Sequence, residues 1–356
     1  MTNIINEIPT HTKTKKAELG QFYTKNYEYI LQNIKVPSFI KNIIEPFAGE
    51  GDLLTYLNNS NQEYNIEAFD IEPKKDNIIQ RDTLLNPPSY KDKYIVTNPP
   101  YLARNKSDNK QIYDLYQQND LYKCFLKALI DELSLGGILI IPLNFICSTR
   151  KNDVLLRKKF LDIYAIQQLN IFEETVFEDT STTVCSLSFL NRNINKPNNY
   201  INIDIYPSKL NIKTLLTEEN NYTIGGEIYN IPKNNNYQFK RLTSKNINER
   251  NTHIVIKCID DNSSSLLRAE YIEQMEKLFV DNTPKCSARG YLTLIINPPI
   301  SIKQQKQLVS DFNLFINKKR QQYHSLFLAN YRESKDIARK RISFDLVYKI
   351  IGYLIS

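Results

Sequence analysis

One seven-residue segment, IVTNPPY at residues 95–101, constrains the fold of this chain more than any other. Residues 94–97 predict a short buried strand, which ends at two prolines because each proline fixes φ and removes an N–H donor. Each proline also pushes the residue before it into an extended conformation. We therefore expect the carbonyl oxygens of Asn98 and Pro99 to be held outward, beside the Asn98 amide and next to Tyr101.

This arrangement of acceptor oxygens and one aromatic ring suits a planar group that carries an NH2, such as the amine of a nucleobase. Open α/β sheets bind their ligands at the carboxyl ends of strands, where this segment is predicted to lie. The alternative is a plain Pro-Pro turn. Residues 297–300 (NPPI) repeat the tripeptide without the aromatic residue, and we interpret that second copy as such a turn.

Two predicted strands upstream end in groups that suit a nucleoside. Residues 41–45 predict a strand that runs into Gly49 and Gly51, and glycines let the backbone approach a ligand closely. The strand at residues 65–69 ends at Asp70, about 20 residues after the glycine turn, where an acid is placed to accept both hydroxyls of a ribose. A strand-end cap is the alternative interpretation of Asp70.

A further short strand at residues 78–83 carries Asp82, so four predicted strand ends in succession deliver a polar or flexible group. Together with predicted helices at residues 120–133 and 153–164, this makes residues 17–190 alternate strand and helix, as doubly wound sheets do. We predict an α/β fold with a doubly wound, mostly parallel, seven-stranded, Rossmann-like sheet.

Three other segments complete this region. The strands at residues 166–172 and 182–190 follow each other more closely than βαβ units would, which favours an antiparallel addition at the sheet edge. Residues 138–143 predict another buried strand, and the polar residues 102–119 are a candidate lid.

Polar residues 191–199 are interpreted as a linker between two domains. The sequence therefore predicts a loose arm at residues 1–16, a ligand-binding domain at residues 17–190 and a smaller α+β domain at residues 200–356. In the second domain we expect strands at residues 201–206, 228–231 and 253–259 and helices at residues 263–278, 302–315 and 344–355.

The net charge of +7 is unevenly divided along the chain. Residues 1–190 contain 21 Lys and Arg against 24 Asp and Glu, a balance of −3, whereas residues 191–356 contain 25 against 15, a balance of +10. This asymmetry favours contact between the second half and a polyanion, with a solvated basic surface as the alternative. Basic residues interleaved with Tyr and Asn indicate nucleic-acid contacts at Lys318, Lys319, Arg320, Arg332, Arg339, Lys340 and Arg341.

Several other classes of protein are disfavoured. The five cysteines are scattered and the three histidines lie far apart, so the sequence predicts neither a disulfide framework nor a metal site. No apolar run approaches the length of a membrane span, and residues 1–16 lack the apolar core of a signal peptide. We therefore expect an intracellular protein, cytoplasmic or DNA-associated, without a membrane partner.

Taken together, the motifs resemble those of S-adenosylmethionine-dependent DNA adenine-N6 methyltransferases of the gamma order, as found in restriction-modification systems. The resemblance covers roughly residues 18–190. The matching segments are GQFYT (20–24), EPFAGEG (45–51), DIEP (70–73), Asp82, NPPY (98–101), LYKCF (121–125) and VF (176–177). One departure is the small number of glycines around the cofactor turn.

The resemblance implies roles for individual residues. Asn98, Pro99, Pro100 and Tyr101 would form the catalytic motif, and Tyr101 and Phe177 would hold the flipped base. Thr24 and Glu45 would meet the methionine moiety of the cofactor, and Phe125 would pack on its adenine. The full implied cofactor set is Phe22, Tyr23, Thr24, Glu45, Pro46, Ala48, Gly49, Gly51, Asp70, Ile71, Asp82, Thr83, Asn98, Pro100 and Phe125.

The same resemblance implies double-stranded DNA as the substrate, target recognition by residues 200–356, and a cognate restriction endonuclease that acts as a separate protein. Two alternatives stay open. The chain could methylate a base amine of RNA or a glutamine amide of a protein, since an Asn-Pro-Pro-Tyr segment can also present those amines. It could also be a catalytically silent relative that binds DNA.

Overall fold

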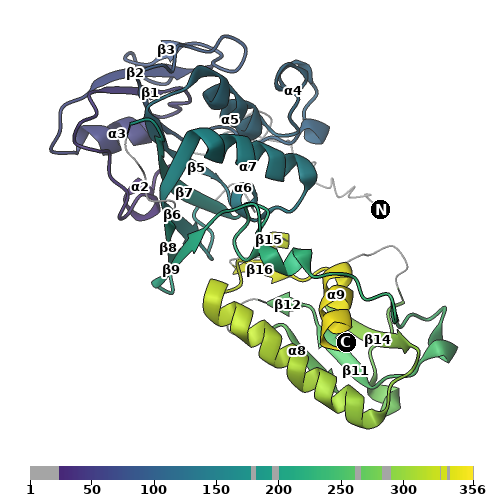
Figure 1. Cartoon of the computed structure of the whole chain (residues 1–356). Helices are drawn as coiled ribbons and strands as arrows, with labels where there is room; N and C mark the ends of the chain where they lie inside the picture. The colour runs from purple at the N-terminus through teal and green to yellow at the C-terminus, as the bar shows by residue number, and fades with distance from the viewer. Residues whose placement is uncertain are drawn as a thin grey trace, which may run out of the picture. The chain divides into compact units, whose positions relative to one another are not determined.

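The computed structural model describes residues 24–177, 182–194, 200–260, 266–282, 290–328, 330–334 and 337–355. Contacts divide the chain into unit 1, Met1–Ile141 with Phe177–Thr180, and unit 2, Pro142–Val176 with Ser181–Ser356 (Figure 1). The arm predicted at residues 1–16 lies outside the described residues. The predicted domain limits, 17–190 and 200–356, stay predictions.

Unit 1 contains a parallel sheet with the strand order β3-β2-β1-β4-β5. Its strands are β1 (Asn42–Glu45), β2 (Asn65–Asp70), β3 (Ile79–Gln80), β4 (Tyr94–Thr97) and β5 (Gly136–Pro142). Its helices are α2 (Tyr27–Ile30), α3 (Asp52–Asn58), η1 (Arg104–Lys106), α4 (Gln111–Tyr116) and α5 (Leu121–Glu132). The chain builds outward from β1 on one side and from β4 on the other, so this part of the sheet is doubly wound as predicted.

Apolar residues explain why β4 lies inside this sheet. All four of its residues are buried, and Ile43 and Ile44 of β1 pair with Tyr94 and Ile95 of β4. Strands covered on both faces are expected to be continuously apolar. The pairing places the carboxyl ends of β1 and β4 side by side.

The first part of unit 2 carries α6 (Asn144–Cys147), α7 (Lys151–Ile163), β6 (Tyr164–Phe172), β7 (Val184–Asn191), β8 (Tyr200–Tyr206) and β9 (Leu210–Leu215). Its strand order is β7-β6-β8-β9. The predicted antiparallel addition is confirmed, because β6 pairs antiparallel with β7. Strand β8 is parallel to β6, and β9 is antiparallel to β8. These four strands and the five of unit 1 make nine, whereas the sequence predicts a seven-stranded sheet.

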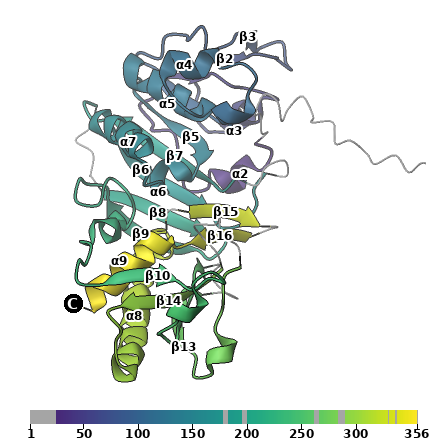
Figure 2. The same cartoon turned by 90° about the vertical axis from the view of Figure 1, so that its right-hand side faces the viewer.

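The rest of unit 2 builds two small antiparallel sheets, ordered β10-β14-β11-β13 and β12-β16-β15. Strands β15 and β16 form a hairpin (Figure 2). The elements are η2 (Gly226–Asn230), β10 (Gln238–Arg241), η3 (Ile247–Glu249), β11 (Ile254–Lys257), β12 (Ile259–Asp260), β13 (Arg268–Tyr271), η4 (Met275–Lys277), β14 (Tyr291–Asn297), α8 (Ile302–Tyr323), β15 (Asn330–Ser334), β16 (Ile337–Arg341) and α9 (Phe344–Leu354).

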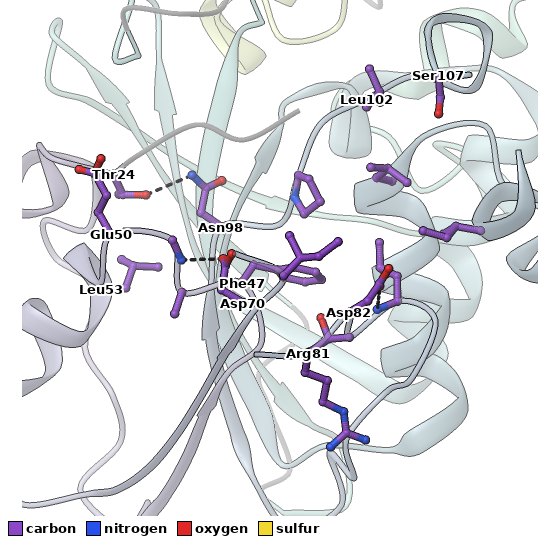
Figure 3. Close-up of a pocket in the computed structure, with 18 of the residues that line it drawn as sticks. Thr24, Phe47, Glu50, Leu53, Asp70, Arg81, Asp82, Asn98, Leu102 and Ser107 are labelled. Carbon is purple, nitrogen blue, oxygen red and sulfur yellow. Dashed lines mark hydrogen bonds between the residues drawn. The ribbon is translucent and has the colours of Figure 1, made fainter. Parts of the chain in front are cut away.

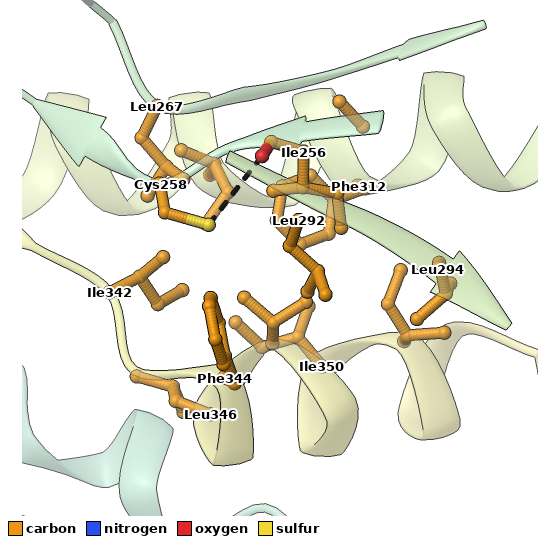
Figure 4. Packing of buried hydrophobic residues seen from close by; sticks show 14 of the residues in the cluster. Ile256, Cys258, Leu267, Leu292, Leu294, Phe312, Ile342, Phe344, Leu346 and Ile350 are labelled. Atoms are coloured by element: carbon orange, nitrogen blue, oxygen red, sulfur yellow. Dashed lines mark hydrogen bonds between the residues drawn. The ribbon is translucent and has the colours of Figure 1, made fainter. Parts of the chain in front are cut away.

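One apolar core joins the β10-β14-β11-β13 sheet to α8 and α9 (Figure 4). Ile256 of β11, Leu292 of β14, Phe312 of α8 and Ile350 of α9 are each at most 1% exposed. The start of α8 is fixed by Ser301, whose hydroxyl accepts from the Gln304 N–H while the Gln304 side chain accepts from the Ser301 N–H. Such a capping box satisfies two N–H groups that the first turn leaves unpaired.

Two sequence predictions in this region are wrong. Residues 228–231 were predicted as a strand but fall in and next to the 3-10 helix η2. Residues 263–278 were predicted as a helix, yet the described part, 266–278, contains β13 and η4. The partner strand decides this case, because all four residues of β13 pair with β11. A local apolar pattern carries no information about that long-range pairing.

A buried ionic cluster lies within unit 2. The Glu173 carboxylate, next to the end of β6, accepts from Lys340 Nζ of β16 and lies 3.0 Å from His324 Nε2 at the end of α8. Lys340 is 0% exposed. Burial raises the pKa of Glu173, but His324 and Lys340 outweigh burial and lower that pKa to about 2. The cluster therefore holds three distant segments of unit 2 together.

Among the described residues, no helix combines the length and apolar character that crossing a membrane requires.

The Lys340→Met variant is expected to lose unfolding free energy, up to about 3–5 kcal/mol, because it removes one partner of a buried ion pair and leaves His324 as the remaining described partner of the Glu173 carboxylate. The double variant Glu173→Gln/Lys340→Met is expected to recover most of that loss, since neither charge then remains. Urea unfolding at neutral pH measures both differences. A single variant within about 1 kcal/mol of wild type, the usual value of an exposed pair, contradicts this interpretation.

The Glu173 carboxylate is also expected to make the folded protein less stable at acidic pH. Its pKa is lowered from 4.5 to about 2 in the folded protein, so its contribution is present above pH 4.5 and is lost as the pH falls toward 2. The double variant should lack that loss. Thermal unfolding at several acidic pH values, with wild type and double variant in parallel, provides the measurement.

Candidate functional site

A cavity of about 260 Å³ opens in unit 1 at the carboxyl ends of the parallel strands (Figure 3). Asp70 ends β2, Asp82 lies just after β3, and Asn98 directly follows β4; all three line this cavity. The strand order reverses between β1 and β4, and open α/β sheets place their ligands at such a reversal. The structure thus brings together the strand-end residues that the sequence singled out.

The glycine turn after β1 forms one wall of the cavity. Gly49 and Gly51 have φ values of 52° and 77°, a left-handed conformation that glycine adopts without steric cost. The Gly49 N–H donates to Asp70 Oδ2 at 2.8 Å, and Asp70 Oδ1 accepts from the Glu72 N–H at 2.8 Å. Because each carboxylate oxygen has two lone pairs, these contacts are compatible with further donors from a ligand.

Asp82 and Thr83 shape the opposite wall. Asp82 Oδ1 accepts from the N–H groups of Leu84 and Leu85 at 3.1 and 3.0 Å, which fixes the turn after β3. The Thr83 hydroxyl donates to the Pro46 carbonyl oxygen at 2.9 Å and so ties this turn to the glycine turn.

Glu45 lies behind the wall at the end of β1 and is 0% exposed. Its Oε1 accepts from the Phe47 N–H at 3.1 Å and from the Thr97 hydroxyl, whereas its Oε2 is buried and has no hydrogen-bond partner among the described residues. Burial is the main cause that raises the pKa of Glu45 to about 8, and nearby Asp70 contributes in the same direction. An unpartnered buried oxygen is costly unless a ligand supplies a donor.

The Asn98 amide is held on both sides. Its Nδ2 donates to Thr24 Oγ1 at 3.1 Å (Figure 3), and its Oδ1 accepts from the Tyr101 hydroxyl. That hydroxyl also lies 2.7 Å from the carbonyl oxygen of Ile140 in β5. The Tyr101 ring is 9% exposed and meets Tyr122 edge to face at 6.3 Å, so it is buried behind Asn98.

The predicted aromatic contacts of the ligand also lie deeper than expected. Phe125 is 0% exposed and meets the Phe47 ring edge to face at 5.1 Å, and it is Phe47 that lines the cavity. Phe125 therefore supports an aromatic wall residue. Phe177 is 5% exposed in this structure.

The lining is strongly acidic. Four carboxylates, Glu50, Asp52, Asp70 and Asp82, line the cavity against one base, Arg81, among the described residues. The Arg81 guanidinium donates to the carbonyl oxygens of Asn86 and Pro87 at 2.7 and 3.1 Å, and Figure 3 shows it extending away from Asp70. Burial and Glu50 raise the pKa of Asp52. Such a site suits a ligand with positive charge and disfavours phosphate groups.

The predicted cofactor residues divide into three groups. Those that line the cavity are Thr24, Ala48, Gly49, Asp70, Ile71, Asp82, Thr83, Asn98 and Pro100. Those in the described structure but not among the lining residues are Glu45, Pro46, Gly51 and Phe125. Phe22 and Tyr23 lie outside the described residues.

Sequence analysis missed much of one wall. Leu102, Ser107, Asn109, Ile112 and Tyr113 line the cavity, and all belong to the segment predicted as a polar lid. The ends of this segment are tied together, since the Arg104 N–H donates to the Asn119 carbonyl oxygen at 2.9 Å. The polar composition was the only signal for it, and composition does not reveal which side chains face inward.

The predicted DNA contacts have unequal surroundings. Lys318 is exposed, whereas Lys319 lies 2.5 Å from a Glu227 oxygen and Arg320 lies 3.0 Å from an Asp260 oxygen. Lys340 is buried against Glu173 and cannot reach a phosphate in this conformation. Arg341 is partly exposed, and the side chains of Arg332 and Arg339 lie outside the described set.

One family model matches residues within the first half of the chain. Residues 12–177 match the sequence model of the family described as Eco57I restriction-modification methylase. The Type II methyltransferase M.AccI of Acinetobacter calcoaceticus is 28% identical over 222 residues, which cover 54% of this chain. The matched region spans 40% of the length of that relative.

Solved structures are similar at a lower level. The methyltransferase subunit of a type I restriction-modification system from Streptococcus thermophilus is 14% identical, with a TM-score of 0.38, covering 57% of this chain and 50% of its own. The type I restriction enzyme EcoKI M protein is 12% identical, with a TM-score of 0.37, covering 83% and 72%. At these scores the fold assignment rests on the strand order.

The Glu45→Gln variant is expected to change the pH dependence of stability. Because the folded pKa of about 8 exceeds the ordinary 4.5, the contribution of Glu45 is fully present below pH 4.5 and is lost as the pH rises to 8. Gln stays neutral throughout. The melting temperature of the variant, relative to wild type, should therefore rise from pH 5 to pH 8.5 in calorimetry of ligand-free protein.

Glu63→Gln, at an exposed carboxylate of the same unit, is the matched control and should give a flat difference. A Glu45→Gln difference that is also flat across this range means that Glu45 is ionised in the folded protein. Only the change of this melting-temperature difference with pH is diagnostic, because the new amide group also changes stability by an amount that does not vary with pH.

Proposed function

We propose that this chain is an S-adenosylmethionine-dependent DNA methyltransferase that acts on adenine N6, a modification enzyme of a restriction-modification system or an orphan relative. One observation carries the proposal: Asn98 of the Asn-Pro-Pro-Tyr segment lines the same acidic cavity as Asp70 and Asp82. An acceptor for an amine and a pocket for an adenosine-bearing cation thus share one wall. The similarity of residues 12–177 to restriction-modification methylases supports the same conclusion.

The residues present fit S-adenosyl-L-methionine. Asp70 would accept hydrogen bonds from the ribose hydroxyls and Asp82 from the amine of the adenine, and Ile71 and Phe47 line the same cavity as apolar neighbours. The unpartnered, buried Oε2 of Glu45 suits the ammonium group of the methionine moiety. The acidic lining suits the positive charge of the ligand, whereas a dinucleotide would bring phosphates into repulsive surroundings.

When bound, the cofactor would supply a methyl group that its positively charged sulfonium makes strongly electrophilic. The leaving group is the neutral thioether that remains. The chain's own residues prepare the nucleophile. The lone pair of adenine N6 is delocalised into the purine ring, and hydrogen bonds from its two N–H groups to Asn98 Oδ1 and the Pro99 carbonyl oxygen draw the nitrogen toward a tetrahedral arrangement. Positioning and fixed dipoles then provide most of the catalysis, and the proton leaves after transfer.

The target adenine must leave the helix to reach these acceptors. Tyr101 and Phe177 are the aromatic residues proposed to hold it, and base–aromatic stacking contributes about 1–3 kcal/mol per base. Both rings are at least nine-tenths buried in this structure, so a base can stack on them only after DNA binding uncovers a face of each ring.

Residues 200–356 are proposed to recognise the DNA target. The balance of +10 over residues 191–356, from 25 basic and 15 acidic residues, supports contact with phosphates. Of the predicted contacts, Lys318 and Arg341 retain the exposure that such contact needs, with Arg332 and Arg339 as further candidates from the β15–β16 hairpin. A cognate restriction endonuclease would act as a separate protein, and the pair would work inside the cell.

The Asn98→Ala variant should lose methyl transfer by at least about a hundredfold, the size of losing a preorganised polar group, while still binding S-adenosyl-L-methionine. Transfer of labelled methyl to duplex DNA, followed by digestion and nucleoside analysis, measures the rate and identifies N6-methyladenine. Equilibrium dialysis of the cofactor is the control. Wild-type rates in Asn98→Ala, or label recovered in RNA or protein only, would overturn the proposal.

A further inference from the structure

The Asn98 side chain belongs to a continuous hydrogen-bonded chain. Asn98 Nδ2 donates to Thr24 Oγ1 at 3.1 Å. The single proton of the Tyr101 hydroxyl is shared between two acceptors, Asn98 Oδ1 and the Ile140 carbonyl oxygen at 2.7 Å. Thr24 is 4% and Tyr101 9% exposed, so both residues are largely shielded from water. Hydrogen bonds in such surroundings restrict side-chain rotation more than exposed ones do.

The backbone on either side of this amide is also fixed. Thr97, the residue before Asn98, donates its hydroxyl to Glu45 at the end of β1. Thr24 donates its backbone N–H to the Asp52 carboxylate at the start of α3. The side chain at position 98 is therefore anchored to β1, β5 and the start of α3, and its remaining freedom is rotation of the amide.

That rotation matters for the proposed chemistry. The two ends of an Asn amide are alike in shape but opposite in hydrogen bonding, since the oxygen accepts and the nitrogen donates. With its orientation reversed, Asn98 would present N–H donors to the amine of the target base, which repels the group it must bind. The oxygen has two lone pairs, so accepting from Tyr101 is compatible with accepting from a target amine.

We propose that Tyr101 and Thr24 are positioning residues whose hydroxyl groups hold the Asn98 amide in its productive orientation. This inference rests on the proposed methyltransferase function and deepens it. It assigns Tyr101 a role through its hydroxyl in addition to the stacking role of its ring, and it assigns Thr24 a role in the transfer step in addition to contact with the cofactor.

Tyr101→Phe tests the inference because it removes the hydroxyl and keeps the ring. We expect kcat for DNA methylation to fall about tenfold, the size of one lost hydrogen bond in a buried site. The KM values for DNA and cofactor should stay within about twofold of wild type. Fluorescence of 2-aminopurine at the target position should report unchanged base flipping.

Tyr90→Phe is the matched control. Tyr90 is also a buried tyrosine of unit 1, but its hydroxyl has no hydrogen-bond partner among the described residues. Its removal leaves the Asn98 chain intact, so kcat should not change. Equal kcat losses in Tyr90→Phe and Tyr101→Phe would mean that any buried phenol matters, which overturns the inference.

Thr24 provides an independent test at the other end of the amide. Thr24→Val removes the hydroxyl at nearly constant shape and should lower kcat with little change in cofactor affinity, whereas Thr24→Ser should restore it. The double variant Tyr101→Phe/Thr24→Val should lose less than the product of the single losses, because both hydroxyls act on one amide. Loss of cofactor affinity with unchanged kcat assigns Thr24 to cofactor binding alone and overturns the inference.

These results are separable from the proposed function. If wild type methylates adenine and Asn98→Ala does not, but Tyr101→Phe and Thr24→Val keep the wild-type kcat, the function stands and the positioning role falls. If wild type transfers no methyl group to DNA adenine, the function itself fails, and the positioning role falls with it.

Discussion

The reversal of strand order between β1 and β4 is the constraint on which the site depends. Because both strands run parallel and end at the same edge, Glu45 and Thr97 become hydrogen-bonded neighbours although 52 residues separate them. Each strand then delivers its following segment to the same place: the glycine turn after β1 and the Asn-Pro-Pro-Tyr segment after β4. Without that pairing, neither segment alone forms a cavity wall.

The charges around the cavity at this edge of the sheet favour a cationic ligand. The four lining carboxylates concentrate negative potential around a cavity with a single lining base among the described residues. Glu45 responds by holding its proton, since burial raises its pKa to about 8. A cationic ligand stabilises the ionised form of such a group, so ligand charge and protein charge are coupled. The same surroundings keep the proposed catalytic amide among fixed, buried partners.

Several features were predictable from the sequence because their causes are local. Prolines 99 and 100 follow the end of β4, Gly49 and Gly51 permit a left-handed turn, and β2 ends in an acid at Asp70. The alternation of strands and helices likewise predicts the parallel sheet of unit 1. What failed were segments governed by distant partners. The residues of β13 follow a helical pattern but pair with β11, and Lys340 belongs to a basic run but is buried against Glu173.

The sequence by itself therefore determined which chemical groups stand at the strand ends, since glycine, proline and strand periodicity act within a few residues. Only the tertiary structure decided where those groups point. The hydroxyl of Tyr101 meets Asn98 and Ile140 because β4 and β5 are neighbours, and Phe125 supports Phe47 from behind because α5 lies against the glycine turn. Such directions depend on contacts between residues far apart in the chain, and no local pattern encodes them.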